Sequence, residues 1–426
     1  IIRNYSAPTF AFMKTENEFV IFELSNGLRV VHKQVNRPVA HCGLMINAGT
    51  RDELADEHGL AHFIEHAIFK GTKKRRSFHI LNRLDSVGGE IDAYTTKETT
   101  CFYGTFLTEY YDRAIELISD ITLNSIFPEA ELEKEKEVVL DEINVYLDTP
   151  SDQIYDDFES QVFQKHSLGN AILGNVDSVR SFNKSHIEKY INRLYTSENM
   201  VFSSVGNISA KKLKEKLEKH FGRLRSGPAI QQRTPFENVT RKIVKTPKET
   251  FQTHCIMGKA AYDTNETKRL SLILLNNILG GPAMNSVLNL KVREKYGYTY
   301  NIESNYSVYT DSGLLSIYLA SDPKYMNRCV TAIQRELKVL RSKKISPNKL
   351  SLAKQQLKGQ LAISRESNNN IMLSYAKSLL IRNKIDPIDR IHNNIDLLDA
   401  NNLLASANEH LNEFELDYLF FEGKVK

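Results

Sequence analysis

The sequence predicts an α+β protein of two similar domains, each a largely antiparallel sheet packed against helices. Short β-rich runs flank turn residues, as FVIFELS and LRVVHKQV flank Asn26-Gly27, and this pattern is typical of antiparallel hairpins. Longer amphipathic segments between such runs predict helices. The second half repeats the first in a weak form, because THCIMGKAAY (253–262) is similar to AHCGLMINAG (40–49). This repeat indicates a duplicated domain.

The first half is expected to alternate groups of strands with helices. Strands are expected within 19–35, 39–48, 90–108 and 200–206, where β-branched and aromatic residues are frequent. Helices are expected within 59–71, 77–87, 109–125, 129–147, 152–163, 185–194 and 210–221.

A polar stretch with three prolines separates the halves, so we place a linker at 226–250. The N-terminal domain is then 1–225 and the C-terminal domain is 251–426. In the second half, strands are expected at 253–262, 296–307, 313–320 and 418–423, and helices before 281, at 325–342 and at 348–380. The sequence gives no role for the polar interruption Ser364–Asn370 inside the last of these helices.

Length and composition describe a globular chain with a mild positive charge. The 426 residues suggest two or three domains, and 41% hydrophobic residues are ordinary for a folded core. A net charge of +4 gives no reason to expect nucleic acid as a partner. The one basic cluster, Lys70 to Arg76, is predicted to be a solvated loop rather than a phosphate site.

Cysteine spacing and hydropathy bear on the compartment. Cys42, Cys101, Cys255 and Cys329 show no C-x-x-C spacing, so we expect reduced core residues. No apolar run reaches the roughly 18 residues that cross a bilayer, so no membrane partner is expected. The start of the sequence lacks the apolar core of a signal peptide, which favours a bacterial-type cytoplasmic location. Because the first residue is Ile, an organelle or the periplasm stays open if a leader was removed.

The run GLAHFIEHAIFKG contains an H-x-x-E-H motif, formed by His62, Glu65 and His66. In a helix, the two histidines lie one turn apart on one face, within reach of a single tetrahedral zinc ion. Glu65 flanks the same position and could take a proton from a metal-bound water. The alternative is a pair of helical histidines that only pack or form hydrogen bonds.

A third protein ligand is expected in the long helix EAELEKEKEVVLDEINVYL. Glu135, Val138, Val139 and Glu142 have the spacing of one helix face, so both glutamates share a face with two valines. A carboxylate on an apolar face requires a cation or a hydrogen-bond partner. Zinc would satisfy Glu142, with Glu135 supporting the ligands from behind. Spacing alone leaves a salt-bridged pair as the other explanation.

The H-x-x-E-H motif followed by the distant glutamate of VVLDEI resembles the M16, or pitrilysin-type, metallopeptidases, also called inverzincins. The chain is most similar to the short members, which resemble the mitochondrial processing peptidase β subunit and its bacterial relatives (M16B). The resemblance implies zinc ligands His62, His66 and Glu142, the general base Glu65 and a supporting Glu135. It also implies two domains that face each other as a clamshell. The repeat LSLILLNNILGG has Leu and Asn where the ligands would be and carries no His or Glu, so only the first domain is expected to bind metal.

The resemblance assigns substrate contacts in both halves. An extended substrate would pair along Asp92, Ala93 and Tyr94. This chain has Asp92 where the family has Asn, so the strand pairing is implied but the side-chain contact to the substrate carbonyl is not. The segment REKYGYTY resembles a family segment whose Arg and Tyr reach the substrate carbonyl, which implies catalytic roles for Arg293 and Tyr300. From the sequence alone, a salt-bridged Arg and a core Tyr would be the simpler interpretation.

Together these features predict an endopeptidase with one Zn²⁺ per chain, which cleaves extended or unfolded peptides inside a closed chamber. We expect a homodimer, or a heterodimer with an inactive sibling. The alternative is a non-catalytic binding or scaffold subunit of a processing-peptidase-like heterodimer, against which the intact motif argues. A third possibility is that the H-x-x-E-H metal site serves a reaction other than proteolysis.

Overall fold

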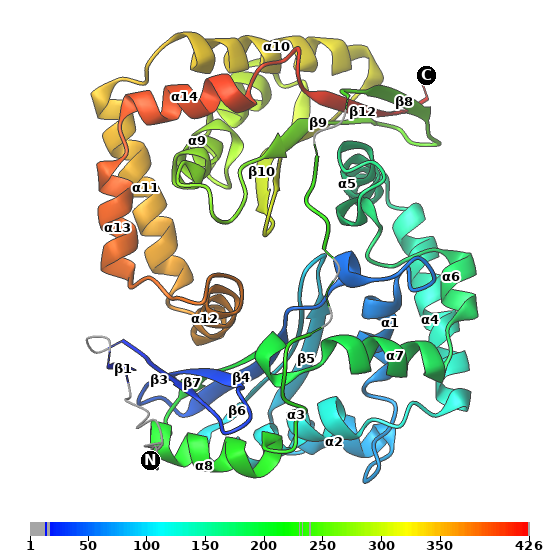
Figure 1. Ribbon diagram of the computed structural model, residues 1–426. Helices are drawn as coiled ribbons and strands as arrows, with labels where there is room; N and C mark the ends of the chain where they lie inside the picture. Colours follow the sequence, from blue (N-terminus) through cyan, green and yellow to red (C-terminus); the bar gives the residue numbers. More distant parts are fainter. Residues whose placement is uncertain (1–12, 15–17, 230, 232, 238–239, 425–426) are drawn as a thin grey trace, which may run out of the picture.

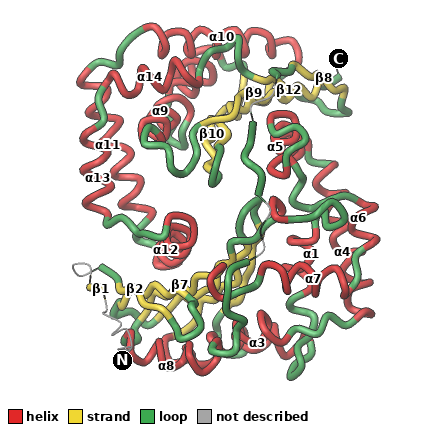
Figure 2. Tube along the Cα trace, viewed as in Figure 1, coloured by secondary structure: helices red, strands yellow, loops and turns green. Residues whose placement is uncertain are grey.

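The chain folds into two halves that face each other across a central gap between their ribbons (Figures 1 and 2). The structure is a computed structural model, and it describes residues 13–14, 18–229, 231, 233–237 and 240–424. Each half contains one sheet covered by helices, and a long connection runs from one half to the other.

The first sheet has seven strands in the order β1-β2-β3-β7-β4-β6-β5. The strands are β1 (Met13–Lys14), β2 (Val20–Glu23), β3 (Arg29–Gln34), β4 (Val39–Ile46), β5 (Glu90–Thr95), β6 (Thr100–Leu107) and β7 (Met200–Gly206). All neighbours are antiparallel except β3 and β7, which run parallel. The predicted hairpin forms between β2 and β3, and Gly27 supplies the positive φ of 88° at its turn.

The second sheet has five strands in the order β10-β11-β9-β12-β8. The strands are β8 (Ile243–Pro247), β9 (Thr253–Ala261), β10 (Thr299–Val308), β11 (Gly313–Ser321) and β12 (Asp417–Glu422). Read from the opposite edge, this order corresponds to β3-β7-β4-β6-β5 of the first sheet. The parallel pair also recurs, because β8 runs parallel to β12. The predicted fold class of two homologous α+β domains is therefore confirmed.

Helices cover both sheets. The first half contributes α1 (Leu60–Ala67), α2 (Ser77–Asp85), α3 (Tyr111–Asn124), α4 (Glu129–Leu147), α5 (Pro150–Val162), α6 (Val176–Ser181), α7 (Lys184–Leu194) and α8 (Ala210–Phe221). The second half contributes α9 (Arg269–Gly280), α10 (Pro323–Ser342), α11 (Pro347–Ser364), α12 (Asn368–Arg382), α13 (Ile388–Leu397) and α14 (Ala400–His410). Within the described ranges, no helix has the length and hydropathy needed to cross a bilayer.

Several elements differ from the sequence-based expectations. The interruption at 364–370 ends α11 and starts α12, so the predicted helix 348–380 is two helices, and Ser367 caps the second. Helices α6, α13 and α14 were not predicted. Strand β8 lies inside the predicted linker 226–250 and joins the second sheet, while the domain boundaries themselves stay a prediction. The four cysteines are free and buried, as expected.

Each half also gives one helix to the sheet of the other half. Helix α5 packs on β9 and β12, and its Phe158 belongs to the same apolar cluster as Leu419. Helix α12 packs on β4 and β7, and its Met372 lies in one cluster with Val201. Figure 1 shows α5 beside the upper sheet and α12 beside the lower one. The two halves therefore hold together through two reciprocal helix–sheet contacts.

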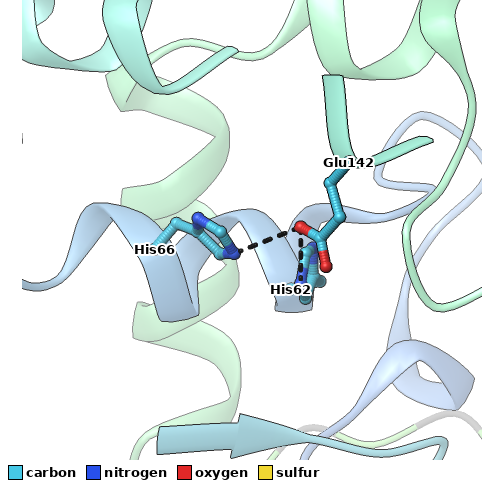
Figure 3. A group of neighbouring side chains, drawn as sticks. All are labelled: His62, His66 and Glu142. Carbon is cyan, nitrogen blue, oxygen red and sulfur yellow. Dashed lines mark ion pairs between the residues drawn. The ribbon is translucent and has the colours of Figure 1, made fainter. Parts of the chain in front are cut away.

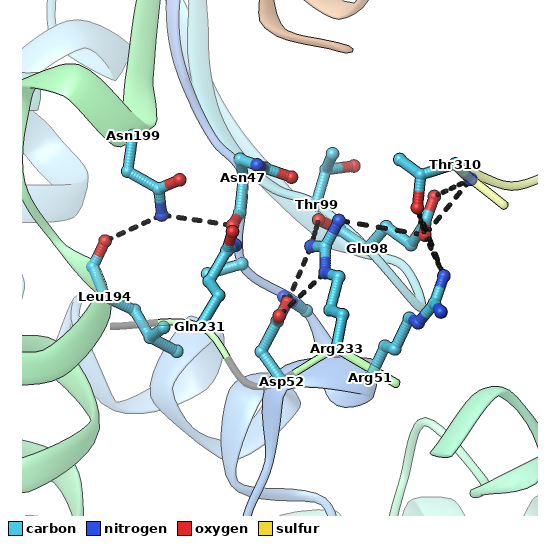
Figure 4. A network of polar contacts seen from close by, with 12 residues as sticks. Asn47, Arg51, Asp52, Glu98, Thr99, Leu194, Asn199, Gln231, Arg233 and Thr310 are labelled. Carbon is cyan, nitrogen blue, oxygen red and sulfur yellow. Dashed lines mark hydrogen bonds and ion pairs between the residues drawn. The ribbon is translucent and has the colours of Figure 1, made fainter. Parts of the chain in front are cut away.

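A polar network joins the halves beside the linker (Figure 4). The buried guanidinium of Arg51 bonds to Glu98 at 2.7 Å and to Asp311, at the β10–β11 turn of the other half, at 2.6 Å. Glu98 also accepts from the backbone N–H of Thr310 at 3.0 Å. Arg233 of the linker binds Asp52 at 2.8 Å. Buried charges of this kind are stable only when each is paired, so the network fixes the position of the β10–β11 turn.

Candidate metal centre

Helix α1 is short, and most of its surface is buried. Leu60, Ala61, Phe63 and Ile64 are almost completely buried, so they fix the rotation of the helix about its axis. At its start, Gly59 has a φ of 90°, and a Cβ there would come within 2.6 Å of the Gly174 Cα. The residues that remain at the edge of this buried surface are His62, Glu65 and His66.

A carboxylate holds the first turn of α1. Glu53 Oε2 accepts from the Gly59 backbone N–H at 2.9 Å, and Oε1 accepts from that of Ala61 at 2.8 Å. These N–H groups have no partner inside the helix, so a carboxylate is a favourable cap. Sequence reasoning missed Glu53, because it lies six residues before Gly59 and nothing in the sequence distinguishes it from other acidic loop residues.

Helix α4 brings its glutamates to α1. It spans Glu129–Leu147, the range predicted from the sequence, and packs against α1. Glu135 and Val139 are buried, but Val138 is 48% exposed, so the expectation of two valines on one buried face is wrong. The buried face of α4 is centred on Glu135 and Val139, which leaves Val138 and Glu142 at its open edge.

The structure brings His62, His66 and Glu142 together (Figure 3), with one possible ligand atom from each within 4.8 Å of the others. Glu142 Oε2 lies 3.7 Å from His62 Nε2 and 3.6 Å from His66 Nε2. Zinc bonds of about 2.1 Å in a tetrahedron separate two ligand atoms by about 3.4 Å. The two distances from Glu142 are close to this value, so the two imidazoles and the carboxylate are suited to hold one zinc ion. No second group of this kind occurs in the described part of the chain.

The two histidines have different surroundings. Burial, and then the charge of His66, lower the pKa of His62 to about 3, so its imidazole is neutral, as a metal ligand must be. Burial also acts to lower the pKa of His66, but a hydrogen bond to Glu135 and the nearby carboxylates raise it overall. The bond joins His66 Nδ1 to Glu135 Oε1 at 2.9 Å, which leaves Nε2 directed to Glu142. Such a bond fixes the ring and its tautomer.

Glu135 itself is held by Lys70, whose Nζ lies 2.5 Å from Oε2. Burial acts to raise the pKa of Glu135, but the hydrogen bonds from His66 and Lys70 lower it overall, so the carboxylate is ionised. The predicted solvated loop at 70–76 is therefore only partly solvated, because Lys70 and the half-buried Arg75 form ion pairs. No local pattern distinguished Lys70 from the lysines that follow it.

Glu65 points into the same region without acting as a ligand in this geometry. Burial raises the pKa of Glu65, and the Thr95 hydroxyl and the charge of His66 act in the opposite direction. Its Oε2 is buried and makes no hydrogen bond to the described residues. A carboxylate with a raised pKa and a free oxygen is suited to accept and release a proton.

A pocket of about 250 Å³ joins this centre to strand β5. Glu65 and His66 line one side, and Asp92 and Ala93 line the other. Asp92 accepts from the Tyr103 hydroxyl at 2.8 Å and from the Ala93 backbone N–H at 2.8 Å. Tyr94 is absent from the described lining of the pocket, and its ring lies 6.1 Å from that of Tyr103. Strand β5 is the last in its sheet, so one of its edges is free.

Arg293 and Tyr300 lie in the second half, outside the described lining of this pocket. The Arg293 guanidinium lies 5.0 Å from the centre of the Tyr300 ring, a cation–π contact. Tyr300 is 82% exposed, so it is not the core residue of the simpler interpretation. The structure thus brings these two side chains to each other, and none of its described contacts joins them to the histidines.

Two imidazoles and one carboxylate form a donor set that suits zinc, and the ionisable Glu65 lies beside them. The chain belongs to peptidase family M16. Residues 29–176 match the family model described as insulinase (peptidase family M16), and residues 181–357 match the model of the peptidase M16 inactive domain.

Curated relatives cover almost the whole chain. The uncharacterized zinc protease YmxG of Bacillus subtilis is 35% identical over 92% of this chain and 95% of its own length. An uncharacterized zinc protease of Mycobacterium leprae is 32% identical over 92% of this chain and 88% of its own length. These relatives support the predicted membership among the short, M16B-like peptidases.

Solved structures share the fold. A peptidase M16 inactive domain from Pseudomonas fluorescens has a TM-score of 0.89 at 18% identity, covering 96% of this chain and 98% of that one. A protease from Helicobacter pylori has a TM-score of 0.88 at 20% identity, covering 95% of this chain and 99% of that one.

Proposed function

We propose that the protein is a zinc-dependent endopeptidase that cleaves extended or unfolded peptides between its two halves. The observation that carries this proposal is the convergence of His62, His66 and Glu142 beside the ionisable Glu65. The family and the names of the relatives, which are zinc proteases, support the same conclusion.

In this proposal His62, His66 and Glu142 hold one zinc ion, and the Glu135 hydrogen bond keeps His66 in the orientation required. When bound there, zinc would polarise the scissile carbonyl and lower the pKa of a bound water molecule. Glu65 would accept a proton from the attacking water at Oε2 and deliver it to the amine that leaves when the C–N bond breaks. Arg293 and Tyr300 act as donors to the developing oxyanion once the substrate lies between the halves.

The free edge of β5 is the proposed binding site for the substrate backbone. An extended peptide can add to such an edge through main-chain hydrogen bonds, which would run along Asp92, Ala93 and Tyr94. Because Asp92 is engaged by Tyr103, its side chain would shape the edge rather than bind the substrate carbonyl. The facing halves favour short or unfolded chains. Rapid cleavage of a stably folded globular protein would contradict this selectivity.

The deciding experiment compares wild-type protein with Glu65→Gln. We expect the variant to retain one zinc ion per chain, measured by elemental analysis, while cleavage of unstructured peptides falls by about three orders of magnitude. Zinc binding without cleavage in the wild type would instead support a non-catalytic subunit. Unchanged cleavage in the variant would remove Glu65 from the mechanism.

The assembly is a separate part of the proposal. We propose a homodimer, with a heterodimer containing an inactive sibling as the other possibility. Size-exclusion chromatography with light scattering, combined with an activity assay on the same fractions, distinguishes the two. A homodimer is expected to be active alone, whereas an obligate heterodimer would gain activity only when the sibling is added.

A further inference from the structure

A second, larger cavity of about 600 Å³ lies between the two halves. Its lining comes from the β5–β6 turn and α5 of the first half, and from the end of β10, the start of α9 and one face of α12 of the second half. Its volume is in the range of ligand-binding pockets. It shares no lining residue with the pocket at the metal centre.

Helix α12 presents a polar face to this cavity. Ser374, Lys377, Ser378 and Arg382 line the cavity and lie on one face of the helix. The opposite face of α12 is buried against the first sheet. The helix is thus held by its apolar residues while hydroxyl and cationic groups face the cavity.

The cations on this side of the cavity are incompletely neutralised. Arg269, at the start of α9, donates to the Thr264 carbonyl at 2.7 Å, and neither Arg269 nor Lys377 forms an ion pair with a described carboxylate. Burial, and then the charge of Arg382, lower the pKa of Arg269. Arg382 binds Asp386 at 3.2 Å. The charges of Asp263 and Asp386 act on the pKa of Arg269 in the opposite direction and do not outweigh burial and Arg382.

Two of the three carboxylates that line the opposite side already have partners. Glu159 of α5 binds Lys97 Nζ at 3.0 Å and accepts from the Tyr309 hydroxyl at 2.9 Å. Glu98 is held by Arg51 at 2.7 Å. Burial raises the pKa of Asp156 of α5, and the positive charge of Lys97 acts in the opposite direction. Among the described charged groups that line this cavity, Arg269 and Lys377 therefore have no ion pair and face only one carboxylate without an ion pair, that of Asp156, which leaves an excess of positive charge.

The segment formed by β5 and the turn after it lines both the pocket at the metal centre and the larger cavity. Asp92 and Ala93 line the pocket at the metal centre, and Thr96 to Thr99, directly after β5, line the larger cavity. Three residues of extended chain cover about 10 Å, so a peptide paired beside Ala93 would reach Thr96 within three to four residues.

We propose that the cavity between α9 and α12 is a carboxylate-binding subsite for the peptide substrate, in which Arg269 and Lys377 select an acidic group three to four residues from the scissile bond. This inference rests on the proposed peptidase function. If the substrate pairs antiparallel to β5, the acidic group is a side chain on the N-terminal side of the scissile bond. If it pairs parallel, the C-terminal side occupies the cavity and a terminal carboxylate can bind.

The test uses four matched unstructured peptides, with Glu or Gln at the subsite position and a free or amidated C-terminus. Peptide binding is measured by fluorescence anisotropy on the full chain carrying Glu65→Gln, and kcat/KM is measured on the wild type. We expect the Glu peptide to bind about tenfold more tightly than the Gln peptide, with the difference falling as salt is added. A preference for the free C-terminus would identify the terminal carboxylate as the bound group.

Two substitutions of Lys377 sharpen the test. Lys377 is exposed, so Lys377→Gln should fold normally and remove most of the preference, and Lys377→Glu should make the Gln peptide bind more tightly than the Glu peptide. Lys212→Gln makes the same change in net charge on the outer helix α8, where the side chain is exposed, and should keep the preference. Cleavage without any acidic preference, or a preference that survives Lys377→Glu, would overturn the subsite and leave the peptidase intact. Lys377-dependent binding without cleavage would overturn the peptidase and leave the subsite.

Discussion

The two halves of the molecule have the same strand order, and they differ most at the helix that follows the first central strand. In the first half this helix is α1, which carries His62, Glu65 and His66 along one edge. In the second half it is α9, whose sequence RLSLILLNNILG contains no histidine or acid and whose leucines are mostly buried. The difference teaches that the pattern of apolar residues is sufficient for the fold, while the metal centre depends on a few polar residues that the fold does not need.

Helices α5 and α12 also separate the apolar residues that hold the fold from the polar residues that face a cavity. Helices α5 and α12 each pack an apolar face on the opposite sheet. Toward the shared cavity, α5 presents Asp156 and Glu159, and α12 presents Lys377 and Arg382. The packing of the two helices is equivalent, and their charges are opposite.

The largest effect should come from removing one of the candidate metal ligands of the first half, because the helix α9 of the second half carries none. Glu142→Gln removes one of three ligands, so we expect zinc affinity to fall by more than the roughly 100-fold that loss of an outer partner can cause, and peptide cleavage to be lost. The Glu142 side chain is 45% exposed, so thermal stability of the zinc-free protein should hardly change. Competition with a chelating dye gives the affinity. Asp141→Asn, on the same helix and exposed, is the control, and equal loss in that variant would argue against a specific ligand.

The next largest effect should come from shortening a buried side chain in α5 or in α12, the helices that each pack on the sheet of the other half. Phe158→Ala in α5 and Met372→Ala in α12 each leave a cavity against the opposite sheet, because both side chains are fully buried. We expect the free energy of unfolding to fall by about 3–5 kcal/mol for the first and about 2–5 kcal/mol for the second. Urea denaturation followed by circular dichroism gives both values. Val145→Ala on an exposed part of α4 should change the free energy by less than about 0.5 kcal/mol.

A smaller effect should come from the residue that supports a ligand without touching the metal. Glu135→Gln weakens the bond to His66 Nδ1, so we expect zinc affinity to fall about 10- to 100-fold. Glu137→Gln, which changes an exposed glutamate of the same helix, should keep the wild-type affinity. If both variants bind zinc equally well, the position of His66 does not depend on Glu135.

The smallest effect concerns the network between the halves. Burial acts to raise the pKa of Asp311, but the hydrogen bonds and charge of Arg51 lower it overall. A lowered folded-state pKa adds stability above the usual value of 3.8, and this stability is lost as the pH falls through the lower folded value. Asp311→Asn should therefore show a shallower loss of Tm between neutral pH and strong acid than the wild type. Parallel Tm curves for the two proteins would contradict a role for this pair.

The sequence by itself determined the weak repeat of the two halves, the β2–β3 hairpin, the bounds of α4 and the placement of His62 and His66 on one helix. Each of these depends on residues that are close in the chain or on a specific motif, so helical and strand periodicity can predict them. Glu142 was assigned as a ligand only by the family resemblance. Only the tertiary structure decided that α5 and α12 each pack on the sheet of the other half, that Lys70 holds Glu135, and that Arg51 joins the halves. Those contacts connect residues far apart in the chain, and their partners are chosen by the packing of whole elements rather than by local preference.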